Sequence, residues 1–149
     1  MNHSIEHHFP NLRPGEYEVT SPASDQYNCV AWAAGQSETW WEPDAADLYF
    51  WPPGLPRLLE LDAYVRAFAT LGYVYCHTGD LEPGVEKVAL YADPKGTPTH
   101  AARQLPNGRW TSKLGQLEDI EHETLDCLSG AAYGTVTILL RRAIQNQPG

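Results

Sequence analysis

The stretch THAARQLPNGRWTSKL, residues 99–114, contains two short segments of period two joined by Pro-Asn-Gly, and it predicts a β-hairpin. Proline at the second position of the loop favours a type I turn, with Gly108 left-handed in a bulge. This turn pairs Leu105 with Arg109, whereas a two-residue Asn-Gly turn would pair Leu105 with Trp110. Because a one-residue slip moves every side chain of a strand to the other face, the turn decides which residues lie together.

The preferred turn places His100 on a face that also carries polar side chains. Its diagonal neighbour across the hairpin is then Ser112, whereas the alternative register gives it Lys113 or Thr111. The side chains predicted to share the face are His100, Ala102, Gln104, Trp110, Ser112 and Leu114.

The segments around the hairpin predict an α+β fold, with helices first and then a mostly antiparallel sheet of about five strands. Period-two or β-branched runs predict strands at 73–78, 86–93, 99–105, 109–114 and 133–142. Apolar residues at helical spacing predict helices at 27–34, 56–71 and 116–128. We interpret residues 1–149 as a single domain, with an extended N-terminal arm at 1–24 and the core at 25–149.

The net charge and the cysteine content exclude several classes of function. The chain of 149 residues has a net charge of −9, which argues against a nucleic-acid partner and an anionic membrane surface. No apolar stretch could span a bilayer, and the first residues do not resemble a secretory signal. We therefore expect a cytoplasmic protein, although specialised export leaves no such mark. Three cysteines without C-x-x-C or H-E-x-x-H predict no metal site, no cofactor and no disulfide framework.

A cysteine, Cys29, heads a short apolar run in DQYNCVAWAAG, residues 25–35. A serine or aspartate before this run can cap a helix over 27–34, and the glycine at the end of the stretch stops it. The first turn of a helix stabilises a thiolate, which is the nucleophilic form of cysteine. The alternative is a structural thiol in an apolar core, which is how we interpret Cys76 and Cys127.

Cys29, His100 and Ser112 have the residue types that a thiol nucleophile needs. The histidine takes the proton of the thiol, and a third group fixes the orientation and tautomer of the imidazole. The predicted hairpin places the histidine and the serine on one face, one strand apart. The sequence therefore predicts Cys29 as nucleophile, His100 as base and Ser112 as the orienting residue.

At these residues the chain resembles the papain-like cysteine hydrolases, in particular the NlpC-type cell-wall peptidases. In that group a cysteine opens a helix, a histidine begins a strand of the form H-V-G-I-Y-x-G-N-G, and a polar residue follows on the next strand. Cys29 matches the nucleophile, and HAARQLPNGRWTS matches the histidine hairpin. The resemblance covers 25–34 and 86–114 and implies a papain-like fold. The stretch GRWTSKLGQLEDIEH also resembles small uncharacterised bacterial proteins.

The chain departs from the pattern of these hydrolases at two positions. The group usually has Asp before the cysteine, where this chain has Asn28. Its third residue is usually His, Asn, Gln or Asp, and the serine of this chain orients an imidazole more weakly. Gln104, Asp119 and His122 are the other candidates for that third role.

We predict a cysteine hydrolase of an amide, isopeptide or thioester bond, with a peptide, an isopeptide or a thioester as substrate, which can be part of a protein. Cys29 would form an acyl-enzyme, and His100 would act as base and then as acid. The backbone N–H of Cys29, with Asn28 or Gln26, would hold the oxyanion. An acyl transferase would use the same pair. The alternative is a non-catalytic acidic interaction or immunity module on a papain-like fold, which the acidity and the tryptophan-rich loop at 36–57 also fit.

Overall fold

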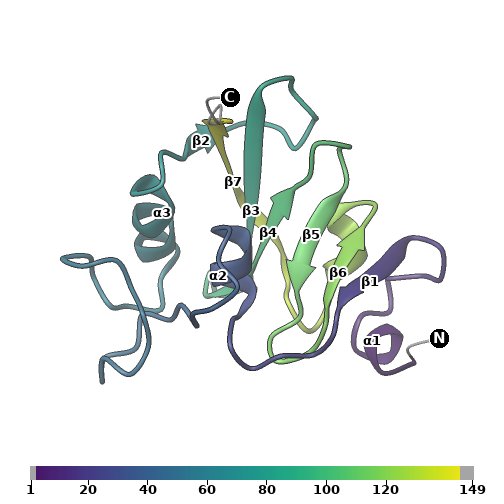
Figure 1. Ribbon diagram of the computed structural model, residues 1–149, viewed down its shortest axis with the longest axis horizontal. Coiled ribbons are helices and arrows are strands. Elements are labelled where there is room, and N and C mark those ends of the chain that lie inside the picture. Colours follow the sequence, from purple (N-terminus) through teal and green to yellow (C-terminus); the bar gives the residue numbers. More distant parts are fainter. Residues whose placement is uncertain (1–2, 145–149) are drawn as a thin grey trace.

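The hairpin lies at the centre of a seven-stranded sheet in the computed structural model, which describes residues 3–144 (Figure 1). The strand order is β1-β6-β5-β4-β3-β7-β2, and each neighbouring pair is antiparallel. The strands are β1 (Tyr17–Ser21), β2 (Val74–Cys76), β3 (Val85–Ala92), β4 (Pro98–Gln104), β5 (Trp110–Lys113), β6 (Asp119–His122) and β7 (Thr135–Ala143). The helices are α1 (His3–His8), α2 (Cys29–Ala33), α3 (Leu61–Ala69) and the 3₁₀ helix η1 (Leu125–Leu128).

The predicted register of the hairpin is confirmed. The Leu105 N–H donates to the Arg109 carbonyl at 2.7 Å, and Gly108 has a φ of +88°. Gln104 therefore pairs with Trp110 in the β4–β5 ladder. Proline fixes the type I turn and glycine alone accepts the left-handed bulge without strain, so the local chemistry of the loop decides the register.

The predicted fold class, a papain-like arrangement of N-terminal helices on a sheet of about five strands, is wrong. The structure is mostly one antiparallel sheet of seven strands, with a few short helices. The five predicted strands correspond to β2, β3, β4, β5 and β7. The two further strands, β1 and β6, come from segments predicted as an arm and as a helix, and they extend the sheet at one edge.

The sequence pattern does not predict strand β6, because polar residues occupy its buried positions. Asp119 and His122 are both fully buried, and Ile120 is the one apolar residue of the strand. The apolar residues at 116–128 resemble a helical stripe, but the segment folds as a turn, a strand and the 3₁₀ helix η1. Gly115, at a φ of +63°, makes the tight turn from β5 into β6.

Strand β1 lies in the segment predicted as an extended arm. It pairs with β6 as an edge strand, and its three central residues are exposed, so no apolar alternation marks it in the sequence. Residues 1–2 and 145–149, which belong to the predicted arm and core, lie outside the described part of the chain.

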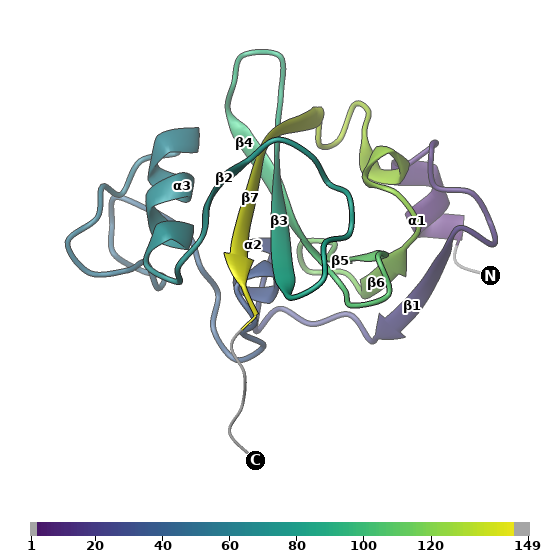
Figure 2. The ribbon, with the colours of Figure 1, turned by 90° about the horizontal axis from the view of Figure 1, so that it is seen from above.

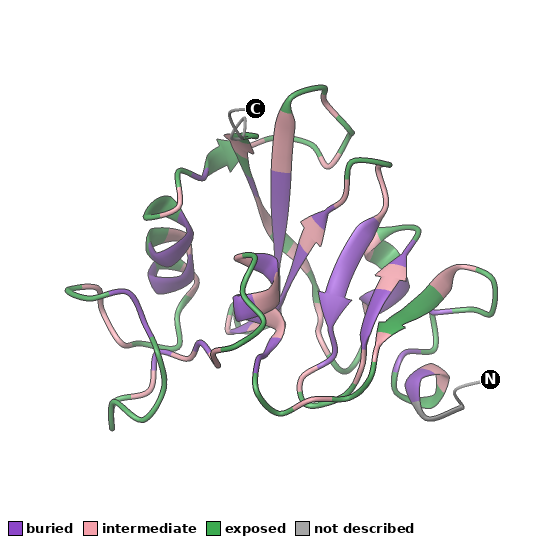
Figure 3. Cartoon of the chain, in the orientation of Figure 1, coloured by how far each residue is buried: buried purple, intermediate pink, exposed green. Residues whose placement is uncertain are grey.

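Each face of the sheet packs against a different set of helices. Helices α2 and α3 cover one face through a cluster that includes Val88, Leu90 and Ala101. Helix α1 and η1 cover the other face through a cluster that includes Tyr91 and Ala102. Figure 2 shows α3 at one end of the molecule and α1 at the other, and Figure 3 shows the central strands as the most buried part. We call these the α2 face and the η1 face.

Helix α3 begins five residues later than the predicted helix at 56–71. The Arg57 guanidinium binds the Asp44 carboxylate at 3.0 Å and the Tyr49 carbonyl at 3.2 Å, which holds the preceding segment in an extended path. The end near Gly72 is as predicted. Within residues 3–144, no helix has the length and the apolar character needed to cross a bilayer.

Candidate functional site

Cys29 is the first residue of α2, and Asn28 fixes its position. The Asn28 side-chain oxygen accepts from the Ala31 and Trp41 N–H groups, each at 3.1 Å. Its side-chain nitrogen donates to the Trp41 carbonyl at 2.7 Å. Asn28 thus caps the helix and binds it to the tryptophan-rich loop at 36–57. These contacts hold the cysteine at a defined place. An amide can do this where an aspartate could not, because the third contact needs a donor.

The Cys29 thiol is neutral in the resting structure, although several neighbours favour its thiolate. Burial raises the pKa of the Cys29 thiol above its ordinary value. The main-chain amides of Ala101, Val30 and Cys29 itself, and the charge of Lys113, lower this pKa in the opposite direction. The amides and the cation thus favour negative charge at the sulfur, whereas burial opposes it.

His100 lies on β4 in an unusual environment for an imidazole. Its exposed fraction is 1%, and both ring nitrogens are buried without a hydrogen-bond partner. The ring stacks on Tyr133, with centroids 4.1 Å apart and planes at 8°, and meets the Tyr91 ring edge-on at 5.2 Å. Burial, and then the charge of His122, lower the pKa of His100 well below its ordinary value. His100 is therefore a neutral base.

Cys29 and His100 approach β4 from its two faces. Cys29 packs against the cluster of the α2 face, which includes Ala101, whereas His100 pairs with Tyr91 on the η1 face. The β4–β5 ladder pairs Arg103 with Thr111 and Gln104 with Trp110. Helix α2 packs on both strands.

No hydrogen bond joins the Cys29 thiol to His100 within the described residues, but their surroundings are shared. The main-chain amide of Ala101, which directly follows His100, lowers the pKa of the thiol. Tyr133, which stacks on His100, has a hydroxyl pKa raised first by burial and then by Cys29. The structure therefore places the predicted nucleophile and base at the same strand, on its two faces.

Ser112 hydrogen-bonds to His122 rather than to His100. The distance from Ser112 Oγ to His122 Nε2 is 2.8 Å, and His122 Nδ1 lies 2.8 Å from the Thr124 carbonyl. A carbonyl only accepts, so Nδ1 carries the proton and Nε2 accepts from the serine hydroxyl. Ser112 and His122 are fully buried, and the charge of His122 acts on His100. Because the Ser112 hydroxyl donates its proton to His122, it cannot donate that proton to His100.

The other candidates for the third role lie apart from the imidazole. Gln104 donates to the Gly79 carbonyl at 2.7 Å. The Asp119 carboxylate accepts from the Thr20 and Tyr27 hydroxyls, and burial, followed by this bond, raises the pKa of Tyr27 to about 12. Sequence reasoning missed Tyr133, because nothing in its spacing from the histidine predicts that the two rings stack.

A cavity of about 310 Å³ lies between the loop at 42–44 and the start of α3. Its lining includes Tyr64, whose hydroxyl pKa is raised by burial and then by Cys29 and Glu42. The cavity combines apolar side chains with two carboxylates. Its lining residues are Glu42, Pro43, Asp44, Leu59 and Tyr64.

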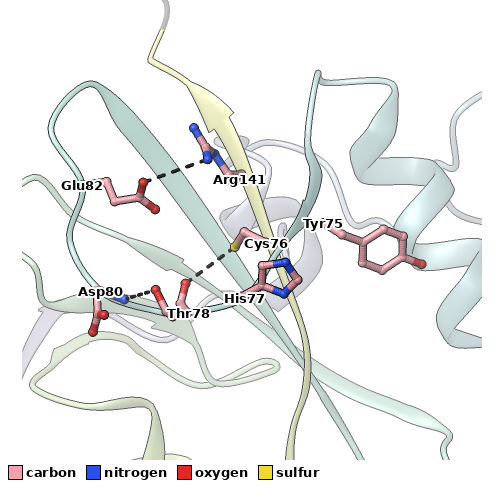
Figure 4. Close-up of a pocket in the computed structure, with 7 residues that line it drawn as sticks. All are labelled: Tyr75, Cys76, His77, Thr78, Asp80, Glu82 and Arg141. Carbon is pink, nitrogen blue, oxygen red and sulfur yellow. Dashed lines mark hydrogen bonds and ion pairs between the residues drawn. The ribbon is translucent and has the colours of Figure 1, made fainter.

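A second hollow, of about 500 Å³, lies at the β2 edge of the sheet and contains another cysteine (Figure 4). There the Cys76 thiol donates to the Thr78 carbonyl at 3.6 Å, and Glu82 faces Arg141. Cys76 is partly exposed, contrary to its interpretation as a core residue, whereas Cys127 is buried as predicted. Cys76 is thus a natural control for the reactivity of Cys29.

Comparison with known proteins identifies one family. No curated protein and no solved structure matches the chain. Nothing in the comparisons links it to papain-like or NlpC-type peptidases, so that resemblance stays a prediction from the motif. The model of the Domain of unknown function (DUF7689) family matches residues 18–141, which include α2, α3 and every strand but the ends of β1 and β7. The chain belongs to the DUF7689 family.

Proposed function

We propose that this protein is a cysteine-dependent acyl-transfer enzyme, with Cys29 as nucleophile and His100 as general base. The observation that carries the proposal is that His100 has two buried, unpartnered ring nitrogens on β4, the strand against which the helix that begins at Cys29 packs. Burying polar atoms without partners costs free energy, and such atoms in a native structure call for an explanation. A proton-transfer role gives one.

Both groups are neutral at rest, so the proton moves when the substrate is bound. Because the two groups lie on the two faces of β4, the proposal requires them to come within hydrogen-bond reach when the substrate binds. His100 takes the thiol proton as sulfur bonds to the carbonyl carbon. The imidazolium then protonates the leaving amine or thiol, which departs and leaves an acyl-enzyme. Water, or an acceptor amine in a transferase, repeats the sequence and restores the thiol.

The surroundings of the sulfur suit the charge that develops in this reaction. The amides of Cys29, Val30 and Ala101 would donate to the oxyanion of the tetrahedral intermediate. The Lys113 ammonium adds positive charge nearby. The cavity beside Tyr64 offers space for the acyl group, which is an amide, isopeptide or thioester donor in this proposal.

Hydrolysis of p-nitrophenyl acetate, an activated acyl donor, tests the proposal. We expect turnover that Cys29→Ser abolishes, because the hydroxyl is a far weaker nucleophile in this site. We expect His100→Ala to lower kcat/KM by about 10²–10⁴-fold, the usual contribution of a general base. Cys76→Ser is the matched control, since it removes a partly exposed thiol outside the site, and its rate should equal that of the wild type.

Three results would overturn the proposal. The first is a wild type without turnover. The second is a rate that Cys29→Ser leaves unchanged, which would assign the hydrolysis to other groups. The third is a rate that His100→Ala leaves unchanged while Cys29→Ser abolishes it, which would remove the histidine from the mechanism.

A second function, binding of a protein partner, is favoured by exposed apolar side chains in the tryptophan-rich loop at 36–57 and directly after it. Leu48 is 76% exposed. The ion pair between Asp44 and Arg57 holds the segment of Leu48 near the exposed leucines that directly follow Arg57. Apolar side chains grouped on a surface are typical of interaction sites. The exposed members are Leu48, Tyr49, Phe50, Leu58 and Leu59. An inactive wild type that loses a copurifying partner on Leu48→Ser would favour this function over catalysis.

A further inference from the structure

The loop between η1 and β7 holds the Tyr133 ring against the imidazole of His100. The two planes are nearly parallel, at 8°, and the centroids are 4.1 Å apart. The edge of Tyr91 meets the same imidazole at 65°. Stacked aromatic rings at this separation attract each other beyond their burial. His100 is therefore fixed by rings and not by hydrogen bonds.

The loop is constructed so that Tyr133 has little freedom. Gly130 and Gly134 exchange two main-chain hydrogen bonds, of 2.9 and 2.7 Å. The Thr99 hydroxyl, one residue before the histidine, donates to the Tyr133 carbonyl. A Cβ on Gly134 would lie 2.0 Å from the Ala92 carbonyl oxygen, so only glycine allows this close approach. The backbone of Tyr133 is thus bound both to its own loop and to β4.

A base that serves a thiol needs a fixed ring plane, which a third polar residue usually provides through a hydrogen bond. In this protein the predicted third residue, Ser112, donates to His122. Gln104 and Asp119 bond elsewhere. The contacts that remain to fix the His100 plane are those of the Tyr133 and Tyr91 rings, and Tyr133 is the one that lies parallel to the imidazole.

We propose that Tyr133 is the positioning residue of His100, and that it fixes the plane of the imidazole by stacking instead of by a hydrogen bond. The inference rests on the proposed function, because it assigns His100 as the base. The face of a tyrosine also attracts a cation, so the stack stabilises the imidazolium that forms during acyl transfer. The hydroxyl is not needed for this role. The effect of Cys29 on the tyrosine pKa agrees with a position beside the thiol.

The test compares Tyr133→Phe, which keeps the stacked ring, with Tyr133→Leu, which removes it. With p-nitrophenyl acetate we expect the phenylalanine variant to stay within about threefold of the wild type. We expect the leucine variant to lose about 10²-fold in kcat/KM, as misplacement of a catalytic group by about 1 Å does. Phe9→Leu is the matched control: Phe9 packs on Tyr133 at 5.0 Å, so its loss lowers stability without removing the stack.

A second readout, the proton chemical shifts of the His100 ring by NMR, does not depend on activity. Stacking on Tyr133 predicts upfield-shifted ring protons in the wild type and in Tyr133→Phe, and a loss of that shift in Tyr133→Leu. Wild-type ring protons without the upfield shift would overturn the inference even if the leucine variant fails to fold. An active wild type that Tyr133→Leu matches in rate would also overturn it and leave the proposed function intact. A wild type that is inactive but shows the upfield shift would refute the proposed function and leave the stack of Tyr133 on His100 in place.

Discussion

Acidification to pH 5 should destabilise the protein through its buried histidines. His122 is fully buried, and its pKa is lowered from 6.5 to about 4. Burial is the main cause; the hydrogen bond to the Thr124 carbonyl raises the pKa and Arg109 lowers it. His100 is shifted in the same direction by burial and by His122. Above pH 6.5 neither imidazole is protonated in the folded or the unfolded chain, so stability there is full.

The size of the loss follows from proton linkage. As the pH falls below 6.5, the unfolded chain binds a proton at position 122 that the folded chain does not, so the free energy of unfolding decreases. Each pH unit removes about 1.4 kcal/mol, which gives about 2 kcal/mol at pH 5 and about 3 kcal/mol once the pH reaches the folded pKa of about 4. His100 adds a further loss over the same range.

Urea unfolding followed by tryptophan fluorescence between pH 7.5 and 5 measures this loss. The variant His122→Gln removes the titrating group but keeps an acceptor for Ser112 and a donor for the Thr124 carbonyl. Its stability should fall less steeply with acidification, by about 1.4 kcal/mol per pH unit. The exposed His77, changed to Gln, is the control and should keep the wild-type slope.

Two outcomes would refute this reasoning. If the wild-type free energy of unfolding is constant from pH 7.5 to 5, then the histidines are not buried as neutral groups. If His122→Gln keeps the wild-type slope, then the proton uptake belongs to other residues.

Three further substitutions test the packing around the site. Asn28→Ala should cost about 2–3 kcal/mol in urea unfolding, because it removes the helix cap and leaves the main chain of Trp41 unpaired; Asn28→Asp should cost less, and an equal cost would contradict the cap. Gly134→Ala should cost at least about 2 kcal/mol, since its Cβ would meet the Ala92 carbonyl at 2.0 Å and its φ is +71°; an unchanged Tm would show that the close approach is absent. Asp119→Asn should cost about 1–3 kcal/mol by weakening two buried hydrogen bonds, but leave the acylation rate unchanged; a slowed rate would return the aspartate to the site.

The sequence was most informative where backbone chemistry left one choice. Proline and glycine in the loop at 106–108 fix the turn, so the register of β4 and β5 followed from the residues alone. The end of α3 near Gly72 followed for the same reason. The helix predicted over 27–34 begins two residues later, at Cys29, because Asn28 caps it in place of the predicted serine or aspartate.

The sequence was least informative where tertiary contacts replace the usual pattern. Strand β6 can bury Asp119 and His122 because the hydroxyls of Tyr27 and Ser112 hydrogen-bond to them. These partners are distant in the sequence, so no local pattern predicts them. This is why the segment was predicted as a helix. The papain-like fold was predicted from the cysteine and histidine motifs alone, which do not determine the number of strands. Tyr133 and His100 are 33 positions apart in the sequence, with two strands and η1 between them. Their stack is therefore visible only in the folded chain.

Identification of the acylated residue tests the central claim most directly. The wild-type protein is mixed with p-nitrophenyl acetate, quenched in acid and digested, and the acetyl group is located by peptide mass spectrometry. Our account predicts acetylation of Cys29 in the wild type, at a rate that falls by about 10²-fold or more in His100→Ala. Acetylation of Cys76 in place of Cys29, or of Cys29 at an equal rate in both proteins, would contradict it.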